Sequence, residues 1–438
     1  MVEFGSAQRG AGKPRLLRDL FLCILSVVLL VSSIGVAGAH ELRLRDLIEE
    51  ALHKSPEVLA SESRALAAGY RPPQAGSLPD PMIMFGYQNE GWDRYTYGKE
   101  SDAQWMFSVS QMFPFPGKLP LKEEMSRQDA EGASIIHESV KLKTIARIRE
   151  LYYDLFLAYK NIDLIKDKTS LFSRIEEAAL ARYSSGMGMQ QEVLMAQTEK
   201  YMLLEKEEMQ KQKIQSFEIM LNAAVGRAAN APLGRPEEQT SAFEAINIEE
   251  LLNKAYEHSP EIRVRQRMVA ASEARVKMAE KEYYPDFTIA ASYFNRGGGQ
   301  FDDMWSLTTT MNIPIFYRTK QRQALLEAEA ALVESKRMLE ATRLMVASAI
   351  RDTYSMWKTA ERLMDIYKNG LMPKTYQDFE SALAGYTTGK TEAITVINRL
   401  KALIDFETLY WAQVAEREKA SARFDSMTGT VETGGMGQ

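Results

Sequence analysis

The chain has 438 residues, of which 45% are hydrophobic and 26% charged, and its formal net charge is -5. This balance is typical of a folded protein and argues against a disordered chain. The negative charge argues against nucleic acid as a partner, because phosphate binding requires a basic face. One cysteine and four histidines provide no zinc-type spacing, so neither a metal site nor another cofactor is predicted.

The N-terminus is typical of a secretory signal. Arg15 and Arg18 precede the apolar run "LFLCILSVVLLVSSIGV", and the small-residue motif "AGA" follows it. This order predicts a signal peptide over residues 1–39, cleaved before His40. An uncleaved membrane anchor is the alternative, but the run is short for a stable span. Cys23 lacks small residues directly before it, so lipidation is not expected.

The rest of the chain contains two copies of one pattern. "LRDLIEEALHKSPE" at Leu44–Glu57 matches "IEELLNKAYEHSPE" at Ile248–Glu261, an offset of 204. "RYSSG" at Arg182–Gly186 matches "GYTTG" at Gly385–Gly389, an offset of 203, and a third pair between them has an offset of 202. Three matches in one order at a nearly constant offset predict an internal repeat.

The repeat divides the chain into segments. Each copy is predicted to run helix, strand pair, very long helix, tight turn and return helix. The predicted segments are a first repeat at 40–225, a linker at 226–246, a second repeat at 247–426 and a disordered Gly-rich tail at 427–438.

The long helices indicate a coiled-coil rod. From Leu119 to Ala181 the only proline is Pro120, and about sixty helical residues would extend roughly 90–100 Å. Apolar residues recur there at heptad spacing, namely Ile145, Ile148, Tyr152, Leu155, Tyr159 and Ile162. The second rod contains Gly370 and Pro373, and a kink is expected there. The helices alone would equally fit a soluble coiled-coil bundle.

Four segments of alternating polarity predict strands at about 82–90, 103–112, 286–294 and 304–313. About ten residues suffice for a tilted strand to cross a bilayer. The apolar side of these strands is predicted to face lipid, through Phe85, Trp105, Phe107, Val109, Ile289, Tyr293, Trp305 and Leu307.

Prolines close the strand pairs. Pro114, together with Gly117, and Pro314 are predicted to form the joints between strand and long helix. Alternating polarity more commonly indicates a sheet of a soluble protein with one solvent-exposed face. However, four strands cannot close a barrel, and lipid tolerates no open sheet edge, so several chains would have to contribute strands.

A set of motifs resembles the TolC family of outer-membrane efflux channels. They are "SPE" near each repeat start, "LPDP" before the first strand, "VSQMFPFPGKL" after the second, "YSSGMGMQQEVLMAQ" and "YTTGKTEAITVIN". The resemblance covers almost all of the chain after the signal. It implies a mainly α fold with a small β part: a homotrimer with a twelve-stranded β-barrel in the outer membrane and a long periplasmic α-helical coiled-coil tunnel. The implied partners are outer-membrane lipid, a periplasmic adaptor (membrane fusion) protein and an inner-membrane efflux pump.

The resemblance also implies functional residues at the two turns. The tips that dock the adaptor would be Arg182, Tyr183, Gly186, Met187, Tyr386, Gly389 and Lys390. The periplasmic gate candidates are Glu192, Tyr386, Glu392 and Asn398. The sequence departs from the family's pattern at Thr395 and Asn398, where acids often occur, and this puts the usual ionic closing ring in doubt.

The predicted function is therefore a passive outer-membrane channel of a tripartite efflux system. It is not predicted to be an enzyme, because the sequence has no nucleotide-binding loop, nucleophile–base pair or metal-ligand spacing. A non-pore periplasmic coiled-coil adaptor or scaffold is the alternative.

The sequence leaves the exported substrate open between metal ions, drugs or other small molecules, and proteins. Its 23 methionines would suit soft metals. However, Met195, Met202, Met209 and Met220 lie in predicted helix, where methionine usually fills the core.

Overall fold

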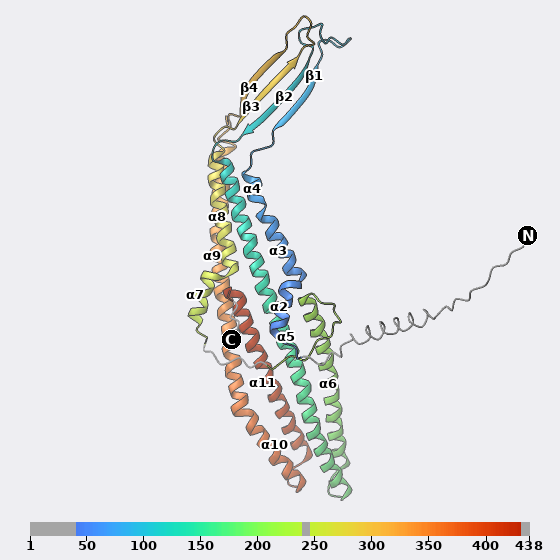
Figure 1. Ribbon diagram of the computed structural model, residues 1–438. Helices are drawn as coiled ribbons and strands as arrows, with labels where there is room; N and C mark the ends of the chain where they lie inside the picture. Colours follow the sequence, from blue (N-terminus) through green and yellow to red (C-terminus); the bar gives the residue numbers. More distant parts are fainter. Residues whose placement is uncertain (1–40, 239–245, 431–438) are drawn as a thin grey trace, which may run out of the picture.

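The computed structural model describes residues 41–238 and 246–430, which form an elongated molecule with a sheet at one end and two helical turns at the other (Figure 1). The predicted signal peptide, part of the linker (239–245) and most of the predicted tail (431–438) lie outside these residues. Within the two described ranges, no helix is both long and apolar enough to cross a membrane.

Each half of the chain runs through short helices, two strands, a long helical rod and a return helix, although the number of helices differs. The first half contains α2 (Leu44–Lys54), α3 (Pro56–Gly69), α4 (Arg71–Gly76), β1 (Met82–Gln88), β2 (Gln104–Phe113), α5 (Lys118–Ser184) and α6 (Gln190–Val225). The second contains α7 (Ile248–His258), α8 (Pro260–Lys281), β3 (Phe287–Asn295), β4 (Met304–Met311), α9 (Gln321–Asp365), η1 (Ile366–Leu371), α10 (Met372–Thr387) and α11 (Ala393–Thr428). The duplication that the sequence suggests stays a prediction.

The two long rods differ in continuity. Helix α5 runs for 67 residues, and its only proline, Pro120, lies in the first turn, where a missing N–H costs nothing. The second rod is interrupted by the π-helix η1, which ends two residues before Pro373. Proline cannot donate a bond to the carbonyl four residues back and crowds it, and the wider π-helical turn accommodates this. At the place of the expected kink, the structure thus has a π-helix that contains Gly370.

A glycine ends the return helix of each half, where it meets the backbone of the opening helices. Gly226 follows α6 with a φ of 91°, and Gly429 follows α11 with a φ of 73°. A Cβ on Gly226 would lie 2.6 Å from the carbonyl oxygen of Lys54. A Cβ on Gly429 would collide with the carbonyl oxygen of His258. Both positions therefore require glycine for two reasons: the backbone is left-handed, and a carbonyl oxygen occupies the place of a Cβ.

The four strands form one antiparallel sheet in the order β1-β2-β3-β4. Strands β2 and β3, which belong to different halves of the chain, pair in its centre. β1 and β4 are the outer strands, and each has one edge without a partner in the described chain. The predicted fold class, mainly α with a small four-stranded sheet, is confirmed.

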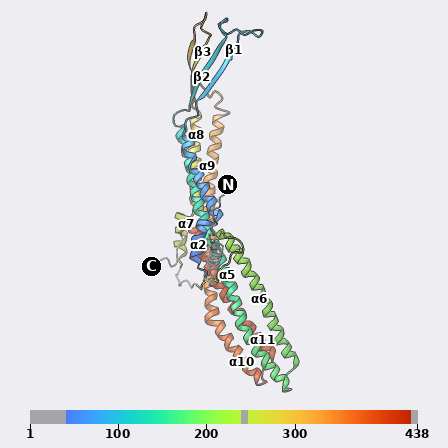
Figure 2. The same ribbon diagram turned by 45° about the vertical axis from the view of Figure 1, so that its right-hand side comes forward.

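Helix α5 lies in the middle of the helical part and packs against α3, α4, α6, α8 and α11. Helices α3 and α6 lie on one side of it, and α9 and α10 continue the array on the other (Figures 1 and 2). The heptad residues of α5 are buried except Tyr159, which is partly buried. Both halves of the chain therefore share one core along α5.

The outer helices leave large apolar side chains uncovered. The exposed set on α6 is Leu194, Tyr201, Met202, Leu204, Met209, Ile219 and Met220. The exposed set on α9 is Leu326, Val333, Met338, Leu344, Met345 and Met356. The expectation that methionines of α6 fill the core is therefore wrong for three of them within one chain, because α6 lies at an edge; Met195 does pack against a buried cluster.

Candidate functional site

The two helical turns lie together at the end of the molecule that is distant from the sheet (Figure 1). The α5–α6 turn contains Gly186 at a φ of 73°, and the α10–α11 turn contains Gly389 at a φ of 77°. One buried cluster joins the two helical hairpins just behind the turns, and its largest members are Phe172, Ile175, Phe379, Tyr386, Ile397 and Leu400. The turns of the two halves thus form one unit, which we call the tip.

Three polar side chains connect the turns across this tip. Arg182 Nη1 donates a 2.7 Å hydrogen bond to the carbonyl oxygen of Tyr386, and Nη2 donates a 3.2 Å bond to the carbonyl oxygen of Met187. The Arg182 guanidinium lies over the Tyr386 ring, 4.9 Å from its centroid. Tyr386 Oη donates a 3.1 Å hydrogen bond to Glu192 Oε2. Arg182, Tyr386 and Glu192 therefore hold α10 against the start of α6.

The chemistry of Tyr386 follows from its surroundings. Its side chain is fully buried. Burial, together with the hydrogen bond to the Glu192 carboxylate, raises the pKa of the Tyr386 phenol to about 12. The phenol is consequently protonated, and able to donate its hydrogen bond, at any pH near neutrality.

Among the other predicted tip and gate residues, only Met187 shares these bonds, through its carbonyl oxygen. Tyr183 and Met187 are exposed, and Lys390 contributes its backbone N–H to the carbonyl oxygen of Gly385 at 2.8 Å. Glu392 precedes α11 without a side-chain cap, and Asn398 is exposed on that helix. The structure thus brings together Glu192 and Tyr386 of the predicted gate, but not Glu392 or Asn398. The sequence analysis placed Arg182 among the docking residues and missed its bond to Tyr386.

All eight residues predicted to face lipid lie on one face of the sheet. The register aligns Phe85, Phe107, Tyr293 and Trp305 across the four strands. A neighbouring row contains Val109, Ala291 and Leu307. Exposed fractions of 62% for Phe85, 80% for Trp305 and 67% for Leu307 leave this face uncovered in the single chain.

The opposite face is less polar than the alternation predicts. Ser108 pairs there with Ser292, whose hydroxyl donates a 2.9 Å hydrogen bond to that of Ser108. The same face contains an apolar row in which Met106 lies between Gly86 and Phe294, with Met304 beyond. This apolar row is visible in the sequence at even-numbered positions of the strands, beside the serines.

Lys118 forms the centre of the joint between sheet and helices, and the sequence analysis missed it. The side chain of Lys118 is only 3% exposed, and its Nζ lies 2.9 Å from Asp286 Oδ1 and 3.4 Å from Glu282 Oε2. Asp286 Oδ1 also accepts a 2.8 Å hydrogen bond from the backbone N–H of Phe115. The ring of Phe115 stacks on Tyr284 at 4.5 Å. The end of β2 and the start of β3 are therefore fixed to each other at the joint.

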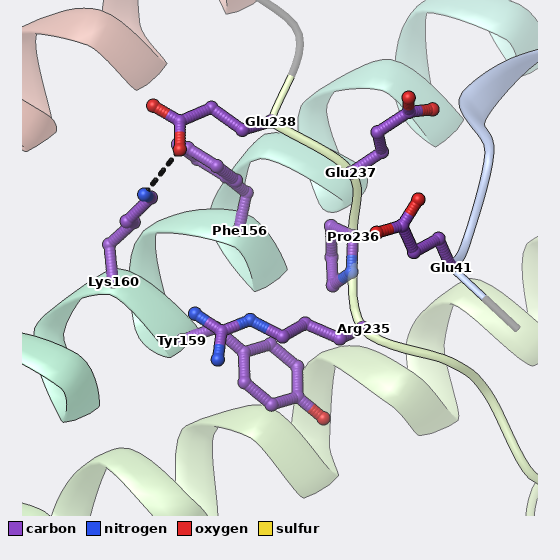
Figure 3. Close-up of a pocket in the computed structure, with 8 residues that line it drawn as sticks. All are labelled: Glu41, Phe156, Tyr159, Lys160, Arg235, Pro236, Glu237 and Glu238. Carbon is purple, nitrogen blue, oxygen red and sulfur yellow. Dashed lines mark hydrogen bonds and ion pairs between the residues drawn. The ribbon is translucent and has the colours of Figure 1, made fainter. Parts of the chain in front are cut away.

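A cavity of about 200 Å³ lies between α5 and residues 235–238 of the predicted linker (Figure 3). Lys160 binds Glu238 at 2.6 Å, and Arg235 lies over the ring of Tyr159 (Figure 3). The cationic groups at this cavity are paired within the chain, Lys160 with Glu238 and Arg235 with Asp163, and these pairs hold residues 235–238 on α5. Across residues 41–238 and 246–430, no group of three or more His, Cys, Asp or Glu side chains is placed to hold a metal ion.

Comparison with known proteins gives a family match over part of the chain and a likeness of fold over most of it. Residues 251–424 match the model of the family described as outer membrane efflux protein. No curated protein matches the chain in sequence.

The solved structures resemble this chain over most of its length. VceC, an outer membrane protein of Vibrio cholerae, is 18% identical with a TM-score of 0.75, over 88% of this chain and 96% of that one. A membrane protein of Pseudomonas aeruginosa is 17% identical with a TM-score of 0.77, over 88% and 90% of the two chains. The CmeC outer membrane channel of Campylobacter jejuni is 14% identical with a TM-score of 0.73, over 88% and 85%. At these identities the likeness establishes the fold.

Proposed function

We propose that this chain, whose residues 251–424 match the model of the outer membrane efflux protein family, is the outer-membrane channel of a tripartite efflux system. It would conduct substrates passively from a periplasmic adaptor and an inner-membrane pump to the exterior. The observation that carries this proposal is the four-stranded sheet, with one exposed apolar face and two open edges, at the end of long helical rods. Such a sheet is stable in lipid only when its edges are closed.

The open edges also support a ring of identical copies. β1 and β4 end the sheet on opposite sides, and the uncovered apolar faces of α6 and α9 lie on opposite sides of the helical array. A surface on one side that fits a different surface on the other generates a closed ring when the rotation closes. We infer a homotrimer, with twelve strands from three copies, by the family resemblance.

The bonded tip is proposed as the periplasmic gate. Tyr386 and Glu192 link the two hairpins of one copy, and Arg182 ties the two turns. Separation of α10 from the start of α6 would break these bonds. The exposed turn residues, including Met187 and Lys390, are proposed as the surface for the adaptor.

The proposal is tested by cell fractionation and by conductance. The mature chain is expected in the outer-membrane fraction, as a trimer that dissociates on heating, and the purified trimer is expected to conduct ions across planar lipid bilayers. Release of the mature chain as a soluble periplasmic species would refute the proposal and favour the alternative of a non-pore adaptor or scaffold. That alternative gives no role to the exposed apolar face of the sheet.

A further inference from the structure

The joint centred on Lys118 has a counterpart in sequence at the outer strands. Lys118 lies four residues after Pro114, which follows β2, and Arg318 lies four residues after Pro314, which follows β4. On the acidic side, Pro285-Asp286 directly precedes β3, and Pro79-Asp80 precedes β1. The basic and acidic halves of the joint therefore occur twice in the chain.

Only one of these two pairs can form within a single copy. Lys118 and Asp286 follow and precede the two central strands, which are neighbours in the sheet. Arg318 and Asp80 adjoin β4 and β1, which are the opposite outer strands. Within one chain the width of the sheet separates Arg318 from Asp80, whereas closure of the sheet by copies would place β4 of one copy beside β1 of the next.

Both members of the second pair lack a charged partner in the described chain. Asp80 is exposed and makes no hydrogen bond or ion pair there. Arg318 is exposed, and within the described residues its only polar or ring contact is with the adjacent Tyr317, through a 3.3 Å bond and a 5.9 Å approach to the ring. In contrast, the equivalent Lys118 side chain is 3% exposed.

The apolar side chains around the two joints show the same difference: they are covered at the first joint and exposed at the second. At the first joint Phe115 is covered by Tyr284. At the second joint Ile315 and Phe316 are 71% and 76% exposed, and on the opposite edge Leu78, close to Asp80, is 49% exposed. Each edge thus presents half of the arrangement that the central strands complete within the chain.

We propose that Arg318 forms an ion pair with the partner subunit's Asp80, and that Ile315 and Phe316 pack against that subunit's first-strand edge. The occupant of this surface is therefore a second copy of the chain, as the opposite charges and the internal Lys118–Asp286 joint indicate. In a trimer the same joint would occur six times, three times within subunits and three times between them, and it would complete the ring of subunits where sheet and helices meet. The inference rests on the proposed trimeric channel.

Cysteine crosslinking tests the contact directly. The only native cysteine is Cys23, in the predicted signal peptide, so the full-length gene with Asp80→Cys and Arg318→Cys yields a mature chain with two thiols. A short bis-maleimide is expected to link this variant into covalent dimers and trimers on denaturing gels. Each single variant, and Asp80→Cys combined with Arg296→Cys at the distant end of the sheet, is expected to remain monomeric on the same gels.

The outcomes separate this inference from the proposed function. A native trimer whose Asp80→Cys/Arg318→Cys variant stays uncrosslinked overturns the inference and leaves the channel intact. A chain of monomeric size in its native state overturns the channel itself. As an independent measurement, Asp80→Arg and Arg318→Asp are each expected to reduce the trimer that survives mild heating, and the double swap is expected to restore it. A double swap as weak as the single variants contradicts the ion pair.

Discussion

Loss of the Tyr386 hydroxyl is expected to loosen the gate. The Tyr386→Phe variant keeps the buried ring but removes the 3.1 Å hydrogen bond to Glu192. A hydrogen bond to a charged acceptor contributes about 1.5–3 kcal/mol. Because Glu192 is only partly buried, water can rehydrate the freed carboxylate, and the lower figure applies. About 1.5 kcal/mol corresponds to a roughly tenfold rise in the ratio of open to closed tips in each subunit.

Single-channel recording in planar bilayers measures this ratio as open probability. Tyr183→Phe is the matched control, because Tyr183 belongs to the same tip and is 46% exposed. Glu192→Gln retains an acceptor and should give a smaller increase than Tyr386→Phe. An open probability of Tyr386→Phe equal to that of Tyr183→Phe would refute the role of the hydrogen bond.

The dependence on pH gives a second readout of the same bond. The pKa of Tyr386 is raised in the folded protein from 10.0 to about 12, so the protonated phenol is favoured by folding. The stabilisation is fully present below pH 10 and is lost as the pH rises toward about 12. The difference in open probability between wild type and Tyr386→Phe should therefore shrink over this interval. A difference that persists unchanged above pH 12 would contradict the assignment.

The remaining predictions concern membrane insertion, packing and the joint. Phe107→Lys, on the apolar face, should cost about 2–4 kcal/mol in lipid and reduce the amount of trimer in the outer membrane. Thr308→Lys, on the other face, should be tolerated. Equal amounts of outer-membrane trimer from the two variants would contradict the assignment of faces. Gly226→Ala and Gly429→Ala should each lower the denaturant midpoint. The loss of stability should exceed the ~1–2 kcal/mol that a left-handed backbone costs a residue with a Cβ, because each new Cβ also meets a carbonyl oxygen. An unchanged midpoint would refute this contact. Lys118→Met should cost about 3 kcal/mol by the same measurement, because it removes the cation that pairs with Asp286, whose side chain is only 14% exposed. A neutral result would contradict a stabilising role of this ion pair.

Periodicity in the sequence was sufficient to predict the long helices and the strands. The alternation in "QWMFSVSQMF" identifies a strand because side chains of a strand point to opposite faces in turn. The heptad residues of α5 identify a long packed helix for the equivalent reason. Pairs such as Pro114 and Pro314 revealed the recurrence of the joint.

Only the tertiary structure decided which side chains meet. Arg182 and Tyr386 are 204 positions apart and Lys118 and Asp286 are 168 apart, and no local pattern encodes a contact over such a distance. The methionines of α6 are a second example, since a helical sequence does not reveal whether its apolar face packs against the same chain or against another. The sequence by itself determined helix, strand and face, because these depend on near neighbours along the backbone. The tip bonds, the buried Lys118 and the uncovered edges depend on how distant segments pack, and only the folded chain shows them.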